Sequence, residues 1–465
     1  MLKPSVVKDL KNIVGTANLA ASPEDLVAYS YDATRMESLP WAVVRPADAG
    51  EVSAVLQLAN RERFPVVPRG AGSGMSGGSV PVRGGVVLSL ERMNRILEID
   101  EQDQIAVVEP GVVTGDLQQA VEKRGLFYPP DPASSRFCTI GGNVAECAGG
   151  LRAVKYGVTR DYVLGLEAVM PTGEIIATGT RTLKSVAGYD LTRLIIGSEG
   201  TLGIVTKVTL RLLPLPESVR TVLAFFSDLG SAAAAAAQVT AARVIPRALE
   251  IVDHFALRAV EAHLREDLSA GASALLLAEV DGSAVSAAAE AETIAEVMRK
   301  AGAVRIETAE RPEERERLWK ARRAISAALY SIKPRKVNED LVVPRSKVPD
   351  ILREIARIGE RYGLLIVNFG HAGDGNIHTN IMIDDRELPK AEAAVREIFD
   401  ATLRLGGSIT GEHGIGLTKA NYLPLEVGKD ALQAMKRIKD ALDPKGVLNP
   451  GKIFANADFG LRNAE

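Results

Sequence analysis

Three of the five histidines in the chain lie in two short glycine-rich segments, residues 368–380 and 411–414. In the first segment, Gly373-Asp374-Gly375 is typical of a tight turn, because glycine tolerates positive φ and Asp-Gly favours hairpins. Apolar runs flank this turn at residues 364–367 and 381–383. The pattern therefore predicts a strand–turn–strand unit that folds His371 back toward His378.

The second segment adds a carboxylate, Glu412, and a third imidazole, His413. Two imidazoles and one carboxylate suit zinc and similar divalent metals, and such a set leaves coordination positions open for a substrate. The alternative is that the two loops are unrelated and that their histidines cap turns. Because all these side chains gather in two short loops, we favour the metal site.

Composition limits the class of protein. The chain has 465 residues, of which 46% are hydrophobic, and a formal net charge of -3, so it is long enough for about three domains with large cores. The absence of a long Lys/Arg run gives no electrostatic reason to expect nucleic acid binding. Two cysteines cannot ligate a four-cysteine iron–sulfur cluster.

No stretch approaches the ~18 apolar residues of a membrane span, and the first residues carry no apolar signal core. These features lead us to expect a soluble, cytoplasmic protein, with peripheral contact at the inner face of the membrane left open.

Strands and helices alternate over the first 213 residues, but several strands follow one another directly. Strands are expected at residues 85–90 and 105–109, and short helices at 51–60 and 116–123. This order favours an α+β fold over a regular doubly wound sheet.

Pro214-Leu215-Pro216 is the clearest candidate for a domain boundary. Beyond it, alanine-rich helices at residues 231–242 and 286–301 alternate with strands such as 273–280. This pattern predicts an antiparallel sheet with helices on one face.

A glycine-rich loop, residues 68–78, follows an expected strand. Its Gly72-x-Gly74-x-x-Gly77 spacing matches the dinucleotide fingerprint, but that fingerprint needs a helix immediately after it. Here Ser79-Val80-Pro81 and another strand follow, so a Rossmann site is not expected. The loop is either a backbone nest for a diphosphate or a glycine-rich surface loop.

Three further segments of small residues favour the nest, at residues 129–134, 141–150 and 197–203. Small residues let the backbone approach a flat ligand closely. Glycine clusters at four separate places indicate one long cofactor threaded between sheets.

These segments resemble the FAD-binding domain of the vanillyl-alcohol oxidase and p-cresol methylhydroxylase (PCMH) superfamily. Residues 371–380, 411–416 and 449–452 resemble its D-2-hydroxyacid dehydrogenase branch, and the resemblance covers nearly the whole chain. That branch includes the FAD subunit of glycolate oxidase, FAD-dependent D-lactate dehydrogenases and D-2-hydroxyglutarate dehydrogenase.

The resemblance implies three parts of an α+β architecture. A PCMH-type FAD-binding domain is expected over residues 1–216, and a substrate-binding cap with an antiparallel sheet and helices over residues 217–408. Residues 409–465 are expected to complete the active site and to pack back on the FAD domain.

The resemblance also implies how FAD is held. Some relatives attach the flavin through a histidine in the first glycine loop, where this chain has Ala71 and Gly72, so we expect non-covalent FAD. The backbone of residues 69–77 would cradle the diphosphate. The residues implied to contact FAD are Arg69, Gly70, Ala71, Gly72, Ser73, Gly74, Gly77, Pro130, Asp131, Ser134, Gly141, Gly142, Asn143, Ala145, Glu199, Gly200, Ile204 and Val205.

In the cap, His371, His378 and Glu412 match the family's ligands for a divalent metal, for which we expect zinc. His413 matches the active-site base. Arg322 is the expected clamp for a substrate carboxylate, since its fork suits a planar carboxylate; the alternative is a solvated helical arginine. The residues implied to contact the substrate are Arg322, Ser326, Lys336 and Asn380.

The expected activity is FAD-dependent oxidation of a D-2-hydroxyacid, D-lactate or glycolate, to the 2-oxoacid. The alternatives are a D-2-hydroxyglutarate dehydrogenase, a non-catalytic flavoprotein subunit, and a metal-binding protein without flavin. With no second redox centre in the chain, the resemblance implies an iron–sulfur subunit or an electron-transfer flavoprotein as electron acceptor. The oligomeric state is left open, with a homodimer as one option.

Overall fold

A computed structural model describes residues 2–269 and 271–454, and the chain forms two compact units. The first unit comprises Met1–Gly149, Val158–Leu215 and Glu412–Glu465, and the second comprises Gly150–Gly157 and Pro216–Gly411. Both units mix helices with sheets, which confirms the predicted α+β class.

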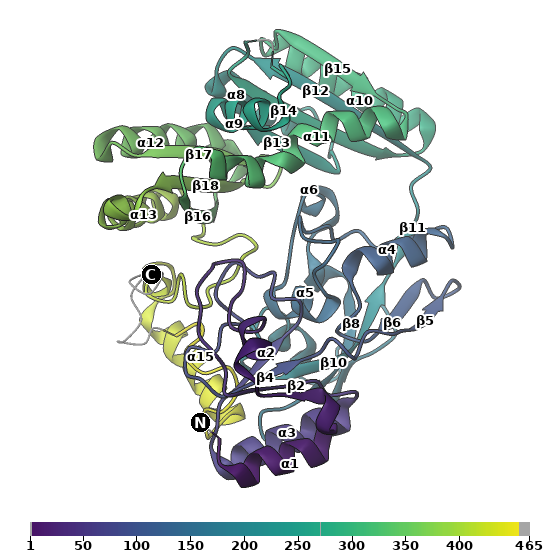
Figure 1. Cartoon of the computed structure of the whole chain (residues 1–465). Coiled ribbons are helices and arrows are strands. Elements are labelled where there is room, and N and C mark those ends of the chain that lie inside the picture. The colour runs from purple at the N-terminus through teal and green to yellow at the C-terminus, as the bar shows by residue number, and fades with distance from the viewer. Residues whose placement is uncertain (1, 270, 455–465) are drawn as a thin grey trace. The chain divides into compact units, whose positions relative to one another are not determined.

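The first unit begins with a small sheet of order β1-β2-β4-β3, in which β2, β4 and β3 run parallel. Helices α1 and α3 lie side by side (Figure 1) and bury Leu10 and Val55 against Leu88 of the sheet. Ser22 caps the short helix α2 by accepting a hydrogen bond from the Asp25 amide. These elements are β1 Leu19–Ala20, β2 Ala42–Val44, β3 Val66–Arg69, β4 Val86–Ser89, α1 Pro4–Val14, α2 Pro23–Val27 and α3 Ala49–Glu62.

A second, antiparallel sheet of the first unit has the order β5-β6-β10-β8-β9. The C-terminal segment joins the small sheet through a bridge between Leu448 and Val66. The remaining elements of this unit are β5 Ile96–Asp100, β6 Ile105–Val108, β7 Leu126–Phe127, β8 Val163–Val169, β9 Ile175–Gly179, β10 Ile204–Arg211, β11 Leu213–Pro214, α4 Thr114–Glu122, α5 Ile140–Glu146, α7 Leu191–Ile195, α14 Leu423–Glu426 and α15 Lys429–Leu442.

The glycine-rich loop leads from β3 directly to β4, and no helix lies between them. This confirms that the loop is not a Rossmann fingerprint, which requires a helix N-terminus at that point.

The second unit is built on a fully antiparallel sheet of order β15-β12-β14-β13-β17-β18-β16. Its strands are β12 Ser218–Phe226, β13 Ala248–Val252, β14 Ala274–Gly282, β15 Arg305–Ala309, β16 Arg335–Val342, β17 Leu365–His371 and β18 Asn376–Ile383. Its helices are α6 Ala153–Tyr156, α8 Leu229–Ala241, α9 His254–Leu264, α10 Ala284–Lys300, α11 Pro312–Ala328, α12 Val348–Tyr362 and α13 Leu388–Arg404.

The antiparallel sheet is confirmed, but the prediction that its helices cover one face is wrong. Leu275 and Leu277 of β14 belong to one core with α9 and α11. The intervening Leu276 and Ala278 are also buried, and α8 and α10 pack on the same strand. Because alternate residues of a strand point to opposite faces, helices cover both sides of this sheet.

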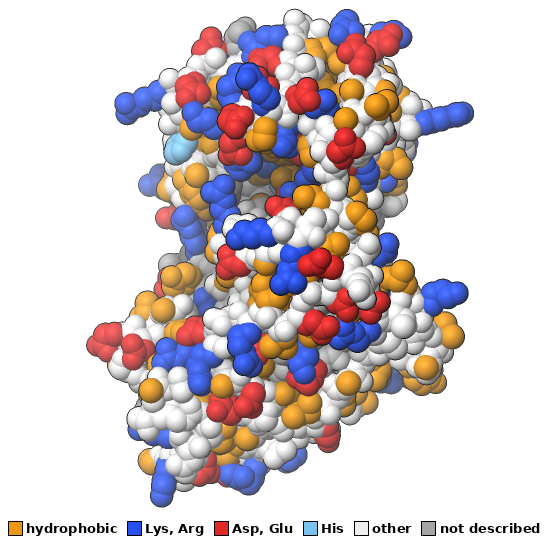
Figure 2. Space-filling view, turned by 90° about the vertical axis from the view of Figure 1, so that its right-hand side faces the viewer, with side chains coloured by type: hydrophobic (Ala, Val, Ile, Leu, Met, Phe, Trp, Pro, Cys, Tyr) orange, Lys and Arg blue, Asp and Glu red, His pale blue; other side chains and the backbone are white. Residues whose placement is uncertain are grey.

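Basic and acidic side chains are interspersed over the face drawn in Figure 2. This fits the near balance of 56 Lys and Arg against 59 Asp and Glu. Among the described residues, no helix has both the length and the apolar character needed to cross a membrane.

Candidate active site

Strands β17 and β18 form the predicted hairpin, with His371 paired to Asn376 and Phe369 to His378. The turn requires glycine at position 375, because φ is 89° there and a Cβ would overlap the carbonyl oxygen of Val343. The hairpin brings His371 Nε2 to 3.3 Å from His378 Nε2. Turn chemistry between two apolar runs was therefore sufficient to predict this approach.

Glu250, on β13, supports His371 from the side. Its Oε1 lies 2.6 Å from His371 Nδ1, and Arg322 Nε donates to its Oε2 at 2.7 Å. Burial opposes the ionisation of Glu250, but attraction to His371 and Arg322 outweighs burial and lowers its pKa to about 2. Sequence reasoning missed Glu250, which is 121 residues from His371.

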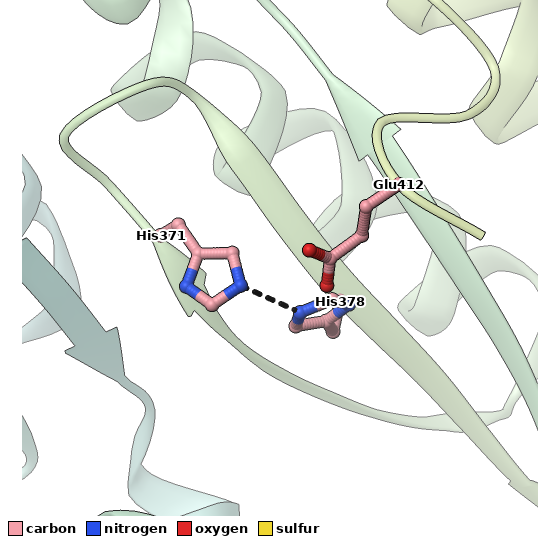
Figure 3. A group of neighbouring side chains, drawn as sticks. All are labelled: His371, His378 and Glu412. Carbon is pink, nitrogen blue, oxygen red and sulfur yellow. Dashed lines mark hydrogen bonds between the residues drawn. The ribbon is translucent and has the colours of Figure 1, made fainter. Parts of the chain in front are cut away.

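Glu412 completes a group of three possible metal ligands. It follows Gly411, whose amide donates to the backbone oxygen of Asp340 at 2.9 Å. One ligand atom each from His371, His378 and Glu412 lie within 4.8 Å of one another, and the Glu412 carboxylate points toward the His378 ring (Figure 3).

The three donors fit a divalent cation. Zinc–ligand bonds of about 2.0–2.2 Å place two ligand atoms no more than about 4.4 Å apart, so the spacing needs only a small side-chain adjustment. In addition, a carboxylate on the second nitrogen of a histidine is a common support for metal-ligating imidazoles, and Glu250 occupies that place on His371.

The candidate substrate residues lie on the same unit as the hairpin. Asn380 Oδ1 accepts from Asn338 Nδ2 at 2.7 Å, and Asn380 shares a face of β18 with His378. Lys336 Nζ donates to Ser326 Oγ at 3.0 Å.

Arg322 lies one helical turn before Ser326 on α11. Its side chain is only 11% exposed, and its guanidinium carbon lies 4.8 Å from the centre of the Phe369 ring. The alternative of a solvated helical arginine is therefore wrong.

A cavity in the first unit gathers most of the candidate FAD residues. All of them line it except Gly77, Pro130 and Asp131. The same cavity is lined by Glu412 and His413, and by residues that sequence reasoning did not single out, among them Glu146 and Thr139.

Local geometry explains the first glycine loop at this cavity. Gly72 has φ of 66°, and a Cβ there would overlap the guanidinium of Arg69. That guanidinium is buried and donates to Tyr31 O at 2.7 Å and Ser79 Oγ at 3.2 Å. The Arg69 side chain thus braces the loop from behind, while the loop backbone faces the cavity.

Glu199 fixes the segment that follows His413. Its carboxylate accepts hydrogen bonds from the amides of Ile415 at 2.8 Å and Gly416 at 2.6 Å. Burial raises the pKa of Glu199 to about 6, although these two amides oppose the shift. The carboxylate is therefore committed to the loop, and we expect only the backbone of residue 199 to be available to a cofactor.

Comparison with known proteins matches both units. Residues 40–179 match the family described as FAD binding domain, and residues 215–453 match FAD linked oxidases, C-terminal domain. The chain is 45% identical to the glycolate oxidase subunit GlcD of Bacillus subtilis, over 98% of each protein. It is 36% identical to a D-lactate dehydrogenase of Archaeoglobus fulgidus, over 92% of this chain and 95% of the relative.

Among solved structures, p-cresol methylhydroxylase with substrate bound superposes with a TM-score of 0.80 at 20% identity, over 98% of both chains. A likeness at this identity shows the shared fold, which is the PCMH-type architecture predicted from the sequence.

Proposed function

Because the chain belongs to the family of FAD-linked oxidases, we propose that it oxidises a small D-2-hydroxyacid, D-lactate or glycolate, to the 2-oxoacid. One observation carries this proposal: the neighbouring residues Glu412 and His413 line the candidate FAD cavity, and Glu412 also belongs to the ligand set of His371 and His378. A single loop thus supplies a metal ligand and a base beside the cofactor.

In this proposal, bound FAD would supply the hydride acceptor, and His371, His378 and Glu412 would hold a divalent metal, zinc, which would polarise the substrate hydroxyl. The protein's own residues bind and orient the substrate. His413 takes the hydroxyl proton as general base, because a neutral imidazole nitrogen carries a lone pair that can accept it. Arg322 presents its two Nη groups to the substrate carboxylate, while its Nε remains on Glu250 at 2.7 Å.

Asn380, Ser326 and Lys336 are proposed to contact the rest of the substrate. Asn380 is fully buried beside His378 on β18, so its amide suits a contact near the reacting carbon. Lys336, held by Ser326 and lying over the Tyr330 ring, suits a more distant anionic group.

The function is tested by reduction of an artificial dye with a panel of D-lactate, L-lactate, glycolate, D-2-hydroxyglutarate and D-malate. We expect turnover with D-lactate or glycolate and little with L-lactate. Preference for D-2-hydroxyglutarate would replace the proposed substrate, and no turnover with any of them would contradict the proposed activity.

We further propose that electrons leave through a separate protein, an iron–sulfur subunit or an electron-transfer flavoprotein. The Bacillus subtilis relative is named as a subunit, and two cysteines cannot ligate a four-cysteine cluster in this chain. In the same assay, oxygen and NAD should therefore be much slower acceptors than the dye. Reoxidation of the flavin by oxygen at the same rate as by the dye would indicate a self-sufficient oxidase.

The flavin is proposed to be non-covalent, because Ala71 and Gly72 stand where some relatives carry the attaching histidine. Acid precipitation of the purified protein should then release all the flavin into the supernatant. Absorbance of the two fractions measures this, and yellow colour retained in the washed pellet would contradict it.

A further inference from the structure

Glu146, the last residue of α5, has a carboxyl group that the proposed chemistry does not use. Its side chain lines the cavity of the first unit. Its Oε2 is buried and has no hydrogen-bond partner among the described residues. Nearly all buried polar groups in proteins are paired, so a carboxyl group that lines a cavity and has no partner among the described residues can take one from a ligand.

The carboxyl group lies between two loops that border the cavity. A Cβ on Gly78 would lie 3.0 Å from Glu146 Oε1, and a Cβ on Gly414 would lie 2.6 Å from Glu146 Oε2. Gly78 ends the glycine-rich loop proposed to hold the diphosphate of FAD, and Gly414 follows His413. Glu146 is therefore at the wall where the most negative part of the cofactor would lie.

The surrounding charges disfavour a second carboxylate here. Burial and repulsion from Glu199 and Asp32 raise the pKa of Glu146 well above its usual value, and Lys452 opposes this only in part. Lys452 Nζ is itself engaged with Val80 O at 2.7 Å and Asn449 Oδ1 at 3.1 Å.

Glu199 and Glu146 differ in the hydrogen bonds that their carboxyl groups accept from the protein. Glu199 accepts two backbone amides, so it holds the negative charge of the pair, and Glu146 holds the proton. The other charged or titratable side chains that line the cavity are Arg69, Cys138, Glu412 and His413. The Arg69 guanidinium donates to Tyr31 O, Ser79 Oγ and Ala28 O, so these hydrogen bonds go to partners other than Glu146.

We propose that Glu146 is a neutral carboxylic acid that donates a hydrogen bond to the diphosphate of bound FAD from the side of its carboxyl group where Oε1 lies against the glycine-rich loop. A carboxylate in the same place would repel the diphosphate, so the protonated form binds FAD more tightly. FAD affinity is then coupled to one proton, and it falls by up to tenfold per pH unit above the pKa of Glu146 in the flavin-free protein. This inference rests on FAD binding and not on the proposed substrate or metal.

The test is titration of flavin-free protein with FAD between about pH 6 and 9. Quenching of the flavin fluorescence measures binding at each pH. Wild-type affinity should fall across this range. E146Q keeps the shape and is a neutral donor at every pH, so its affinity should stay level and should exceed that of the wild type at the alkaline end. E122Q, an exposed position on α4, is the matched control and should follow the wild type.

A wild-type affinity that does not change with pH, or an E146Q affinity that falls in parallel with it, would overturn the proposal. ADP-ribose carries the same internal diphosphate without the isoalloxazine, and its affinity should show the same fall. A fall for FAD alone would refute the diphosphate contact. If E146Q does not fold, calorimetry of the wild type at the alkaline end of this range, in two buffers of different ionisation enthalpy, should show uptake of up to one proton on binding. No uptake at the pH values where the affinity falls would refute the coupling.

Discussion

Replacement of His413 by asparagine should slow reduction of the flavin by substrate by roughly 10²–10⁴-fold, the usual scale for loss of a general base. His413 lines the candidate FAD cavity and lies next to Glu412. Asparagine keeps a similar size and a hydrogen-bonding group but cannot take up the hydroxyl proton. Stopped-flow bleaching of the flavin absorbance measures this step without the acceptor.

The control for this variant is His254→Asn, because His254 is exposed at the start of α9 in the second unit. It should reduce flavin at the wild-type rate. The FAD content of His413→Asn should also remain unchanged, since the proposed role of His413 is in catalysis and not in binding. A near-wild-type rate of flavin reduction in His413→Asn would remove His413 from the mechanism.

The local sequence was sufficient to predict those features that neighbouring residues determine. The Gly373-Asp374-Gly375 turn and its two apolar flanks predicted the hairpin that joins His371 and His378. The lack of a helix after Gly77 excluded a Rossmann site, and the chain indeed continues into β4.

Long-range pairing was not predictable in this way. Glu250 reaches His371 only because β13 pairs with β17 in a register that sets these two residues opposite each other. Residues 140–146 form α5, capped by Thr139, although glycine lowers helix propensity. Tertiary packing decides both features, as it decides that helices cover both faces of the large sheet.

Glu412 and Glu146 also differ in how far the local sequence identifies them as functional residues. Glu412 was identifiable because it lies beside His413 in a glycine-rich loop. Glu146 lies in a segment of small residues, where a lone charged side chain was the only available signal. Its unpaired carboxyl group becomes evident only when the fold brings Gly78 close to Oε1 and Gly414 close to Oε2.

The second large effect concerns the proposed metal ligands. His378→Ala removes one of three donors that lie within 4.8 Å of one another, and it should abolish turnover while leaving FAD bound. Chelation of the wild type should have the same result, because a divalent cation would polarise the substrate hydroxyl in the proposed reaction. Metal content, flavin content and dye reduction are measured on the same preparations.

The Glu250→Gln variant distinguishes a residue that supports a metal-binding histidine from a residue that binds the metal directly. The amide keeps the shape but loses the charge that holds His371 Nδ1 at 2.6 Å and Arg322 Nε at 2.7 Å. Loss of such a supporting carboxylate typically weakens metal binding by 10–100-fold, so activity should return when excess zinc is added, unlike in His378→Ala. His263→Ala, at an exposed position on α9, should bind metal as the wild type does. Full activity in a metal-free preparation of the wild type would show that these side chains serve the substrate directly.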